Sequence, residues 1–419
     1  MPRSTIIRDA QVFDGTGAPT RPAEVLVVGD RIAAVADEIS RADRRGADVV
    51  DGAGATLMPG LVEAHAHLGF GSTVERRDPN RDQPVEEKAM LAAHAGRVLL
   101  DHGYTSAYSG GNRLPAVEVA LRKAFAEGWM PGPRFKAASW EGSAGMVSPG
   151  VYDFPGIDGR ASDPDSIRDF VAGMADLGVD IVKLTLSGES AVWAGTSRIL
   201  QFTEEEVAAA AAMARQRGVW LTAHAHADES VKLAVRHGVR AIYHCTFAEE
   251  EALDLLEAAR DRVFVAPTPG IVYANLYEAD SEPEEGMEVA ETRKRITALA
   301  PELRRRGVRV LPGGDYGFHW NPVGRNARDL QLFVEWLGFT PAETLRAATQ
   351  YGGQLMDMAG ELGLVRPGYL ADLLLVDGDP LADIRILQDP DRLLMIMQGG
   401  VFHKVDPERH RRAATLTAI

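Results

Sequence analysis

Histidine, lysine and aspartate side chains occur repeatedly at the ends of short apolar runs in this sequence. The first run ends with His65 and His67, two positions apart. Because alternate residues of an extended strand point to one side, these two imidazoles can bind a single metal ion. The other candidates in later runs are Lys183, His224, His244 and Asp315. A single histidine at a strand end is more often structural, but this set at one end of several strands predicts a metal site.

Lys183 is unusual because it lies inside an apolar run, residues 179–186. An unpaired ammonium group is costly to bury. Either a salt bridge to a neighbouring acidic side chain balances it, or the lysine takes part in the metal site.

The elements that would position these residues alternate regularly along the chain. Eight apolar runs are separated by longer amphipathic stretches, which are rich in Ala, Glu and Arg. The runs are residues 57–62, 105–108, 134–138, 179–186, 219–223, 239–243, 263–266 and 308–311. This alternation predicts an α/β protein, a (β/α)₈ TIM barrel, whose active site lies at the carboxyl ends of its strands. An open doubly wound sheet is the alternative.

The two chain ends have a different pattern. Residues 5–56 and 360–404 consist of short β runs separated by Gly- and Asp-containing turns. Neither end is long enough for its own core, so we expect them to form one small composite β-sandwich. The predicted organisation is residues 1–57 with 359–405 as this domain, 58–358 as the barrel, and 406–419 as a tail.

Composition excludes several classes of protein. The chain has 419 residues, 45% of them hydrophobic, and a net charge of −15. This acidity disfavours nucleic acid as a partner. Nothing in the sequence resembles a signal peptide or a membrane span, so we expect a cytoplasmic protein that does not bind membranes. The single cysteine, Cys245, excludes an internal disulfide and is expected to be a small buried residue.

Three motifs resemble the amidohydrolase superfamily, in its binuclear branch. They are Asp-Gly-Thr-Gly at 14–17, Met-Pro-Gly-Leu-Val-Glu-Ala-His-Ala-His at 58–67 and Pro-Gly-Tyr-Leu-Ala-Asp-Leu at 367–373. The chain is most similar to the imidazolonepropionase- and prolidase-like subgroup, and residues 313–318 resemble phenylurea and thiocarbamate hydrolases. Residues 108–112 and 141–146 depart from the Arg-Asp and Gly-Gly-His stretches of many relatives, which argues against dipeptidase-like recognition.

The resemblance implies a role for each candidate. His65 and His67 match ligands of a first metal ion, and His224 and His244 match ligands of a second. Lys183 matches a carbamylated lysine that bridges the two ions, and Asp315 matches the aspartate that binds the first ion and shuttles the proton. Asp315 and His244 are therefore the expected catalytic residues. The expected cofactors are two divalent ions sharing a bridging hydroxide, zinc by default, with cobalt or manganese as alternatives.

The long loops after the strands are rich in aromatic residues, so we expect a pocket for an apolar or aryl group. The candidate substrate contacts are His226, Trp140, Tyr273, Tyr316 and His319. The predicted activity is metal-dependent hydrolysis of a carbonyl–nitrogen bond in a small amide, urea or carbamate, by a protein that forms homo-oligomers.

Other activities remain open. They are dipeptidase- or carboxypeptidase-like hydrolysis of N-acyl amino acids, and hydrolysis of esters, lactones or phosphotriesters. A mononuclear deaminase and a non-enzymatic scaffold are weaker alternatives. For a peptidase, Arg76, Arg77 and Arg81 could bind the substrate carboxylate.

Overall fold

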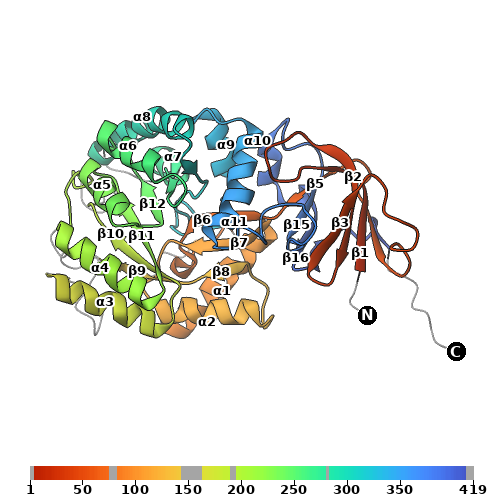
Figure 1. The fold of residues 1–419 in the computed structure, drawn as a ribbon, viewed down its shortest axis with the longest axis horizontal. Coiled ribbons are helices and arrows are strands. Elements are labelled where there is room, and N and C mark those ends of the chain that lie inside the picture. The colour runs from red at the N-terminus through yellow and green to blue at the C-terminus, as the bar shows by residue number, and fades with distance from the viewer. Residues whose placement is uncertain (1–3, 75–82, 143–162, 189–194, 280–282, 412–419) are drawn as a thin grey trace.

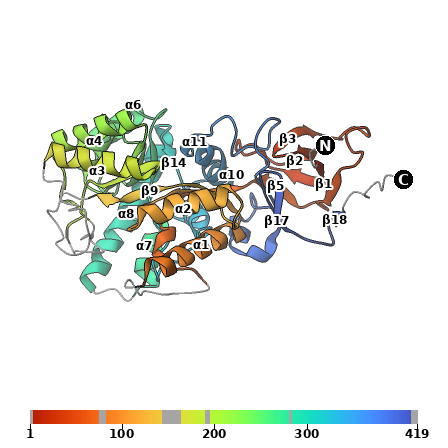
Figure 2. The ribbon, with the colours of Figure 1, turned by 90° about the horizontal axis from the view of Figure 1, so that it is seen from below.

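The fold is described from a computed structural model, which covers residues 4–74, 83–142, 163–188, 195–279 and 283–411. Figure 1 shows two parts side by side, a ring of helices around parallel strands and a separate sheet built from both chain ends. Figure 2, turned by 90°, places both termini on the sheet side, away from the barrel.

The parallel strands form the predicted barrel. They are β6 (Leu61–Ala66), β7 (Tyr104–Ser109), β8 (Arg134–Lys136), β9 (Ala138–Gly142), β10 (Ile181–Thr185), β11 (Trp220–Ala225), β12 (Ala241–His244), β13 (Phe264–Ala266) and β14 (Arg309–Val310). Neighbours pair in parallel within β6–β8 and within β9–β14. The ring closes where Asp315 N donates to His65 O at 3.1 Å and His67 N donates to Tyr316 O at 2.6 Å. The (β/α)₈ prediction is confirmed, and the open sheet is excluded.

The third predicted run, 134–138, is divided between β8 and β9. Between them, Ala137 N donates to the Asp180 carboxylate at 2.9 Å instead of to a neighbouring strand. The break lets β8 pair with β7 while β9 pairs with β10. Strand β9 continues beyond the predicted run to Gly142 and therefore contains Trp140 and Glu141.

Helices follow most barrel strands and cover the outside of the ring (Figure 1). They are α1 (Val85–Asp101), α2 (Pro115–Ala126), α3 (Pro164–Leu177), α4 (Glu204–Arg217), α5 (Asp228–Arg236), α6 (Glu250–Ala258), α7 (Pro269–Tyr277), α8 (Pro283–Arg305), α9 (Arg328–Glu335), α10 (Pro341–Arg346) and α11 (Gly352–Leu355). Side-chain caps begin several of them, as at Asp163 before α3 and Thr203 before α4. Within the described ranges, we find no helix with both the length and the apolar character needed to cross a bilayer.

The sheet from the chain ends, here called the end sheet, has nine strands. They are β1 (Ser4–Val12), β2 (Arg21–Val28), β3 (Arg31–Ala36), β4 (Asp48–Asp51), β5 (Thr56–Pro59), β15 (Leu373–Val376), β16 (Leu393–Gln398), β17 (Val401–Val405) and β18 (His410–Arg411). Antiparallel pairing of β5 with β15 joins the amino-terminal and carboxyl-terminal segments. A composite domain built from both ends is therefore confirmed.

The first predicted run, 57–62, is not one strand. Its first half lies in β5 of the end sheet, and the barrel strand β6 begins at Leu61. Gly60 separates the two, and a side chain there would collide with Thr105. The predicted domain limits, 1–57, 58–358, 359–405 and 406–419, stay a prediction.

Candidate metal centre

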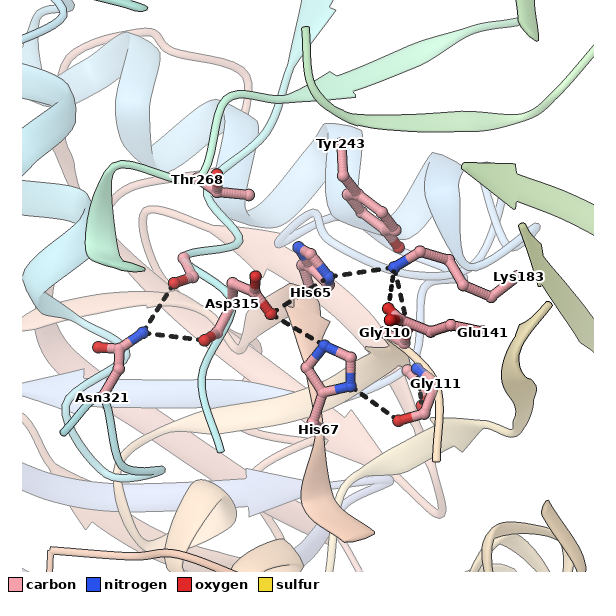
Figure 3. Close-up of polar contacts among 12 residues, drawn as sticks. His65, His67, Gly110, Gly111, Glu141, Lys183, Tyr243, Thr268, Asp315 and Asn321 are labelled. Atoms are coloured by element: carbon pink, nitrogen blue, oxygen red, sulfur yellow. Dashed lines mark hydrogen bonds and ion pairs between the residues drawn. The ribbon is translucent and has the colours of Figure 1, made fainter. Parts of the chain in front are cut away.

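Two clusters of buried ligand-type side chains lie at the carboxyl ends of the barrel strands. His65, His67 and Asp315 form the first, and their ligand atoms lie within 4.8 Å of one another. His67 Nε2 is 2.9 Å from Asp315 Oδ1, and His65 Nε2 is 3.5 Å from the same oxygen. Figure 3 shows both imidazoles directed at this carboxylate. Two imidazoles and one carboxylate are a common ligand set for a divalent ion.

The second cluster contains His224, His226 and His244. The ring centroids of His224 and His244 are 4.4 Å apart, and the His226 ring stacks on His244 at 4.2 Å. His226 was predicted as a substrate contact, yet the structure places it among the ligand-type atoms. The sequence signal for this was present, since His226 follows His224 by two residues on β11 and its continuation.

Threonine hydroxyls fix the orientation of two of these rings. His244 Nδ1 is 2.7 Å from Thr268 Oγ1, and His226 Nδ1 is 2.7 Å from Thr246 Oγ1. His244 Nε2 is buried and has no protein partner among the described residues. An orphaned ring nitrogen, held in place through its other nitrogen, is the arrangement expected of a metal-binding histidine. The donor set therefore fits a metal ion.

Burial also favours the neutral, metal-binding form of two of the imidazoles, His65 and His244. Desolvation, helped by the Lys183 ammonium, lowers the pKa of His65 well below its usual value. Desolvation and the neighbouring His226 likewise lower the pKa of His244. Burial opposes the charged form of His67 too, but the Asp315 carboxylate outweighs it and raises the pKa of that ring. Neutral rings bind metal without first losing a proton.

Lys183 is fully buried on β10, and its Nζ lies 3.4 Å from His65 Nε2 of the first cluster. Its Nζ is 3.0 Å from Glu141 Oε1 and donates to Gly110 O at 3.0 Å, and it lies 4.4 Å from the centre of the Tyr243 ring. The salt bridge foreseen as one alternative is therefore present. Burial raises the pKa of Glu141, but Lys183 and the imidazoles overcome this and lower it overall. Carbamylation of Lys183 stays a prediction.

Asp329 of α9 stabilises the loop that contains Asp315 through hydrogen bonds to residues on both sides of it. One oxygen of Asp329 accepts Gly313 N at 2.9 Å, and the other accepts the Tyr316 hydroxyl at 3.3 Å. Asn321 Nδ2 also donates to Asp315 O at 2.9 Å (Figure 3). Asp315 itself has φ 62°, a left-handed conformation that a non-glycine residue rarely adopts and that surrounding contacts must maintain.

His67 is positioned in a similar way through Glu118 of α2. His67 Nδ1 lies 2.8 Å from Gly111 O, and Gly111 N donates to Ser109 Oγ at 3.1 Å. Ser109 Oγ donates to Glu118 Oε1 at 2.8 Å, while Glu118 Oε2 accepts Ala138 N at 2.7 Å. Burial raises the pKa of Glu118 to about 7. The sequence analysis did not name Glu118, because a glutamate within a helix carries no local signal that it will be buried beside a strand end.

Aromatic rings adjoin the first cluster. The Phe70 ring stacks on His67 with centroids 4.4 Å apart, and Phe318 lies 5.2 Å from Phe70. Trp320 stacks on Phe318 at 5.1 Å. All three rings are partly exposed, so they form an apolar surface beside the first metal-type cluster.

The other predicted substrate contacts differ in their burial and in the rings that they contact. Trp140 is buried against Phe170 of α3, in the core outside β9. Tyr316 is fully buried, with its hydroxyl on Asp329. Tyr273 packs against Tyr277 and Trp336, and His319 is exposed beside Trp320. Trp140 and Tyr316 therefore make packing contacts, and their roles at the substrate stay predictions.

Comparison with known proteins agrees with this geometry. The profile of the Amidohydrolase family matches residues 56–402. The chain belongs to the amidohydrolase family.

Relatives in sequence include ochratoxinase from Aspergillus niger, 26% identical over 96% of this chain and 86% of that protein. Imidazolonepropionase from Rubrobacter xylanophilus is 26% identical over 90% of each chain. Among solved structures, a Xaa-Pro dipeptidase with bound methionine superposes with a TM-score of 0.81 at 25% identity, covering 96% of this chain and 100% of that one. Phenylurea hydrolase B shares the fold, with a TM-score of 0.73 at 20% identity over 95% of this chain and 96% of that one.

Membership in the amidohydrolase family makes this chain a hydrolase that acts on carbon–nitrogen bonds of small molecules. The family generally uses a binuclear metal centre, and two clusters able to bind metal are present here.

Proposed function

We propose that this amidohydrolase cleaves the carbonyl–nitrogen bond of a small amide, urea or carbamate that carries an aryl or other apolar group. In this proposal His65, His67 and Asp315 hold one divalent ion, and His224 and His244 hold the other. Lys183, once carbamylated, would bridge them, and zinc is the expected metal because imidazole ligands predominate. When bound, the ions lower the pKa of a water molecule towards neutrality and polarise the substrate carbonyl.

In this proposal Asp315 is the residue that moves the proton. Its Oδ1 lies against His67 and His65 at the base of the first cluster, and Asn321 and Asp329 hold its loop. In the proposed reaction Asp315 accepts the proton of the attacking water and delivers it to the leaving nitrogen. His244 has the complementary task of presenting a neutral Nε2, oriented through Thr268.

The observation that carries the choice of substrate is the aromatic surface of Phe70, Phe318 and Trp320 beside His67. A phenyl group buried against these rings contributes about 1.5–3 kcal/mol. At about 1.4 kcal/mol per decade, this equals roughly 10- to 150-fold in kcat/KM.

The test compares two substrates with the same acyl group, an N-aryl amide and an N-acyl amino acid. We expect the aryl substrate to be preferred, and Phe318→Ala to lower its kcat/KM selectively. Phe402→Ala, in the end sheet, is the control. If the free carboxylate is preferred and Phe318→Ala affects both substrates equally, the aryl proposal is wrong.

The likeness to a Xaa-Pro dipeptidase favours hydrolysis of N-acyl amino acids as the second candidate. The arginines suggested for the substrate carboxylate, Arg76, Arg77 and Arg81, lie outside the described residues. The same substrate pair decides between the two candidates, and adding an ester and a lactone tests the remaining alternative. The roles of His226, Tyr273 and His319 at the substrate, the cytoplasmic location and the homo-oligomer stay predictions.

A further inference from the structure

A cavity lies at the opposite end of the barrel from the metal-type clusters. Its volume is about 660 Å³, and it opens beside the first residues of β11, β12, β13 and β14. The residues that matter to its chemistry are Trp220, Arg240, Arg262, Phe264, Arg309 and Gln354. Along β11, His224 lies four positions after Trp220, which corresponds to about 13 Å of extended chain at about 3.3 Å per residue. This space, here called the arginine cavity, is distinct from the active site.

The charge of the arginine cavity is opposite to that of the whole protein. Arg240, Arg260, Arg262 and Arg309 line it, and Asp261 is the one acidic residue among its described lining residues. The full chain carries a net charge of −15. Four arginines lining one concave site in such a protein form a local centre of positive potential, which attracts anions.

Aromatic rings hold two of the guanidinium groups in fixed planes. The Arg240 guanidinium lies 4.0 Å from the centre of the Trp220 ring, and that of Arg309 lies 3.9 Å from Phe264. Stacking uses the faces of the guanidinium groups and leaves their N–H edges for hydrogen bonds. The rings therefore fix the planes of both guanidinium groups. One edge of the Arg240 group is already occupied, because its Nε donates to Leu355 O at 3.2 Å and its Nη2 donates to Gln354 O.

Gln354 of α11 brings these two arginines together. Its backbone oxygen accepts from Arg240 Nη2 at 2.7 Å, and its side-chain oxygen accepts from Arg309 Nη1 at 3.1 Å. Arg309 Nε also donates to Arg260 O at 3.1 Å. Arg309 Nη2, in contrast, is buried and has no partner among the described residues.

The two charges are incompletely neutralised. Asp357 lies 3.5 Å from Arg240, but its side chain is 60% exposed. Burial, and then repulsion from Arg240, lower the pKa of Arg309. A buried donor without a partner and two like charges side by side are both unfavourable, and an oxyanion would relieve both. A doubly charged oxyanion would relieve them more than chloride or a monocarboxylate would.

We propose that the arginine cavity binds a small dianionic oxyanion, either a phosphate group or a dicarboxylate, with Arg309 and Arg240 as the principal donors. Both ligands carry several oxygens, so different oxygens of one ligand can accept hydrogen bonds from the two guanidinium groups. The proposal concerns a site separate from the hydrolytic centre and does not depend on the proposed substrate.

The test is calorimetric titration of the metal-loaded protein with inorganic phosphate and, in a second arm, with succinate, each at constant ionic strength. We expect saturable binding of at least one dianion and none of chloride. Arg309→Met, which keeps the apolar stem, should weaken binding at least tenfold. Arg262→Met should also weaken it, and because Arg262 is exposed its replacement leaves the fold intact. The matched control is Arg215→Met, on the exposed surface of α4.

The two arms distinguish the two forms of the ligand, since the better-bound probe identifies a phosphate or a dicarboxylate. Three results would overturn the proposal. The first is a response to chloride equal to that of the dianions. The second is phosphate binding that persists in both Arg309→Met and Arg262→Met, which would place the anion at the metal centre. The third is self-association that depends on these arginines and excludes phosphate, which would make the cavity a docking site for an acidic segment of a second copy.

Discussion

Asp329 provides a prediction whose size can be worked out from its surroundings. Its carboxylate is 1% exposed, and one of its oxygens accepts Gly313 N, two residues before Asp315. Burial raises its pKa from 3.8 to about 7, against the opposing effect of its hydrogen bonds. The rise spans about three pH units, which corresponds to about 4 kcal/mol at about 1.36 kcal/mol per unit.

The sign of this effect follows from proton binding. Between pH 3.8 and about 7, the folded protein keeps a proton on Asp329 that the unfolded chain has released. The free energy of unfolding therefore falls as the pH rises through this window. Asp329→Asn removes the titration, and it also disturbs a hydrogen bond at a cost of about 1–3 kcal/mol that does not vary with pH.

The expected outcome is a pH-dependent difference between the two proteins. At pH 5 Asp329→Asn should be less stable than the wild type. By pH 8 this gap should shrink by about 3 kcal/mol, because about two pH units of the window lie above pH 5. Urea unfolding of both metal-loaded proteins at several pH values measures it, because effects of metal binding and of Glu118 are common to both and cancel. A gap that is the same at pH 5 and pH 8 would show that Asp329 is not held protonated.

Three further predictions concern the metal centre. Asp315→Asn should keep its bound metal, measured by elemental analysis, yet lose most turnover, because an amide cannot accept the proton; turnover near the wild-type rate would contradict its assigned role. Lys183→Ala should lose activity and regain part of it when small carboxylic acids are added, whereas the control Lys294→Ala, at an exposed position, should behave as the wild type. A density map that shows an unmodified Lys183 ammonium with both metal ions fully bound would disprove carbamylation. Thr268→Val should weaken metal binding about 10- to 100-fold, because His244 loses the hydroxyl that orients it. Competition with a chelator measures this affinity, and an unchanged value would argue against His244 as a ligand.

The sequence by itself determined where the reactive side chains lie. Alternation along a strand places His65 and His67 on one face, and the regular β/α pattern brings the ends of several strands to one edge of the barrel. These are local properties that depend on residues close together in the chain. They were sufficient to predict the barrel, the composite end domain and the residues of the two clusters, apart from the grouping of His226 with His224 and His244.

Only the tertiary structure decided how those side chains are held. Glu118 and Asp329 come from helices far along the chain, and the side that each presents to the barrel depends on how its helix packs. The division of residues 57–62 at Gly60 likewise depends on a distant partner, because β5 pairs with β15 more than 300 residues away. The arginine cavity needs the beginnings of four strands and α11 at once. Such features arise from packing between remote segments, which no local pattern of residues encodes.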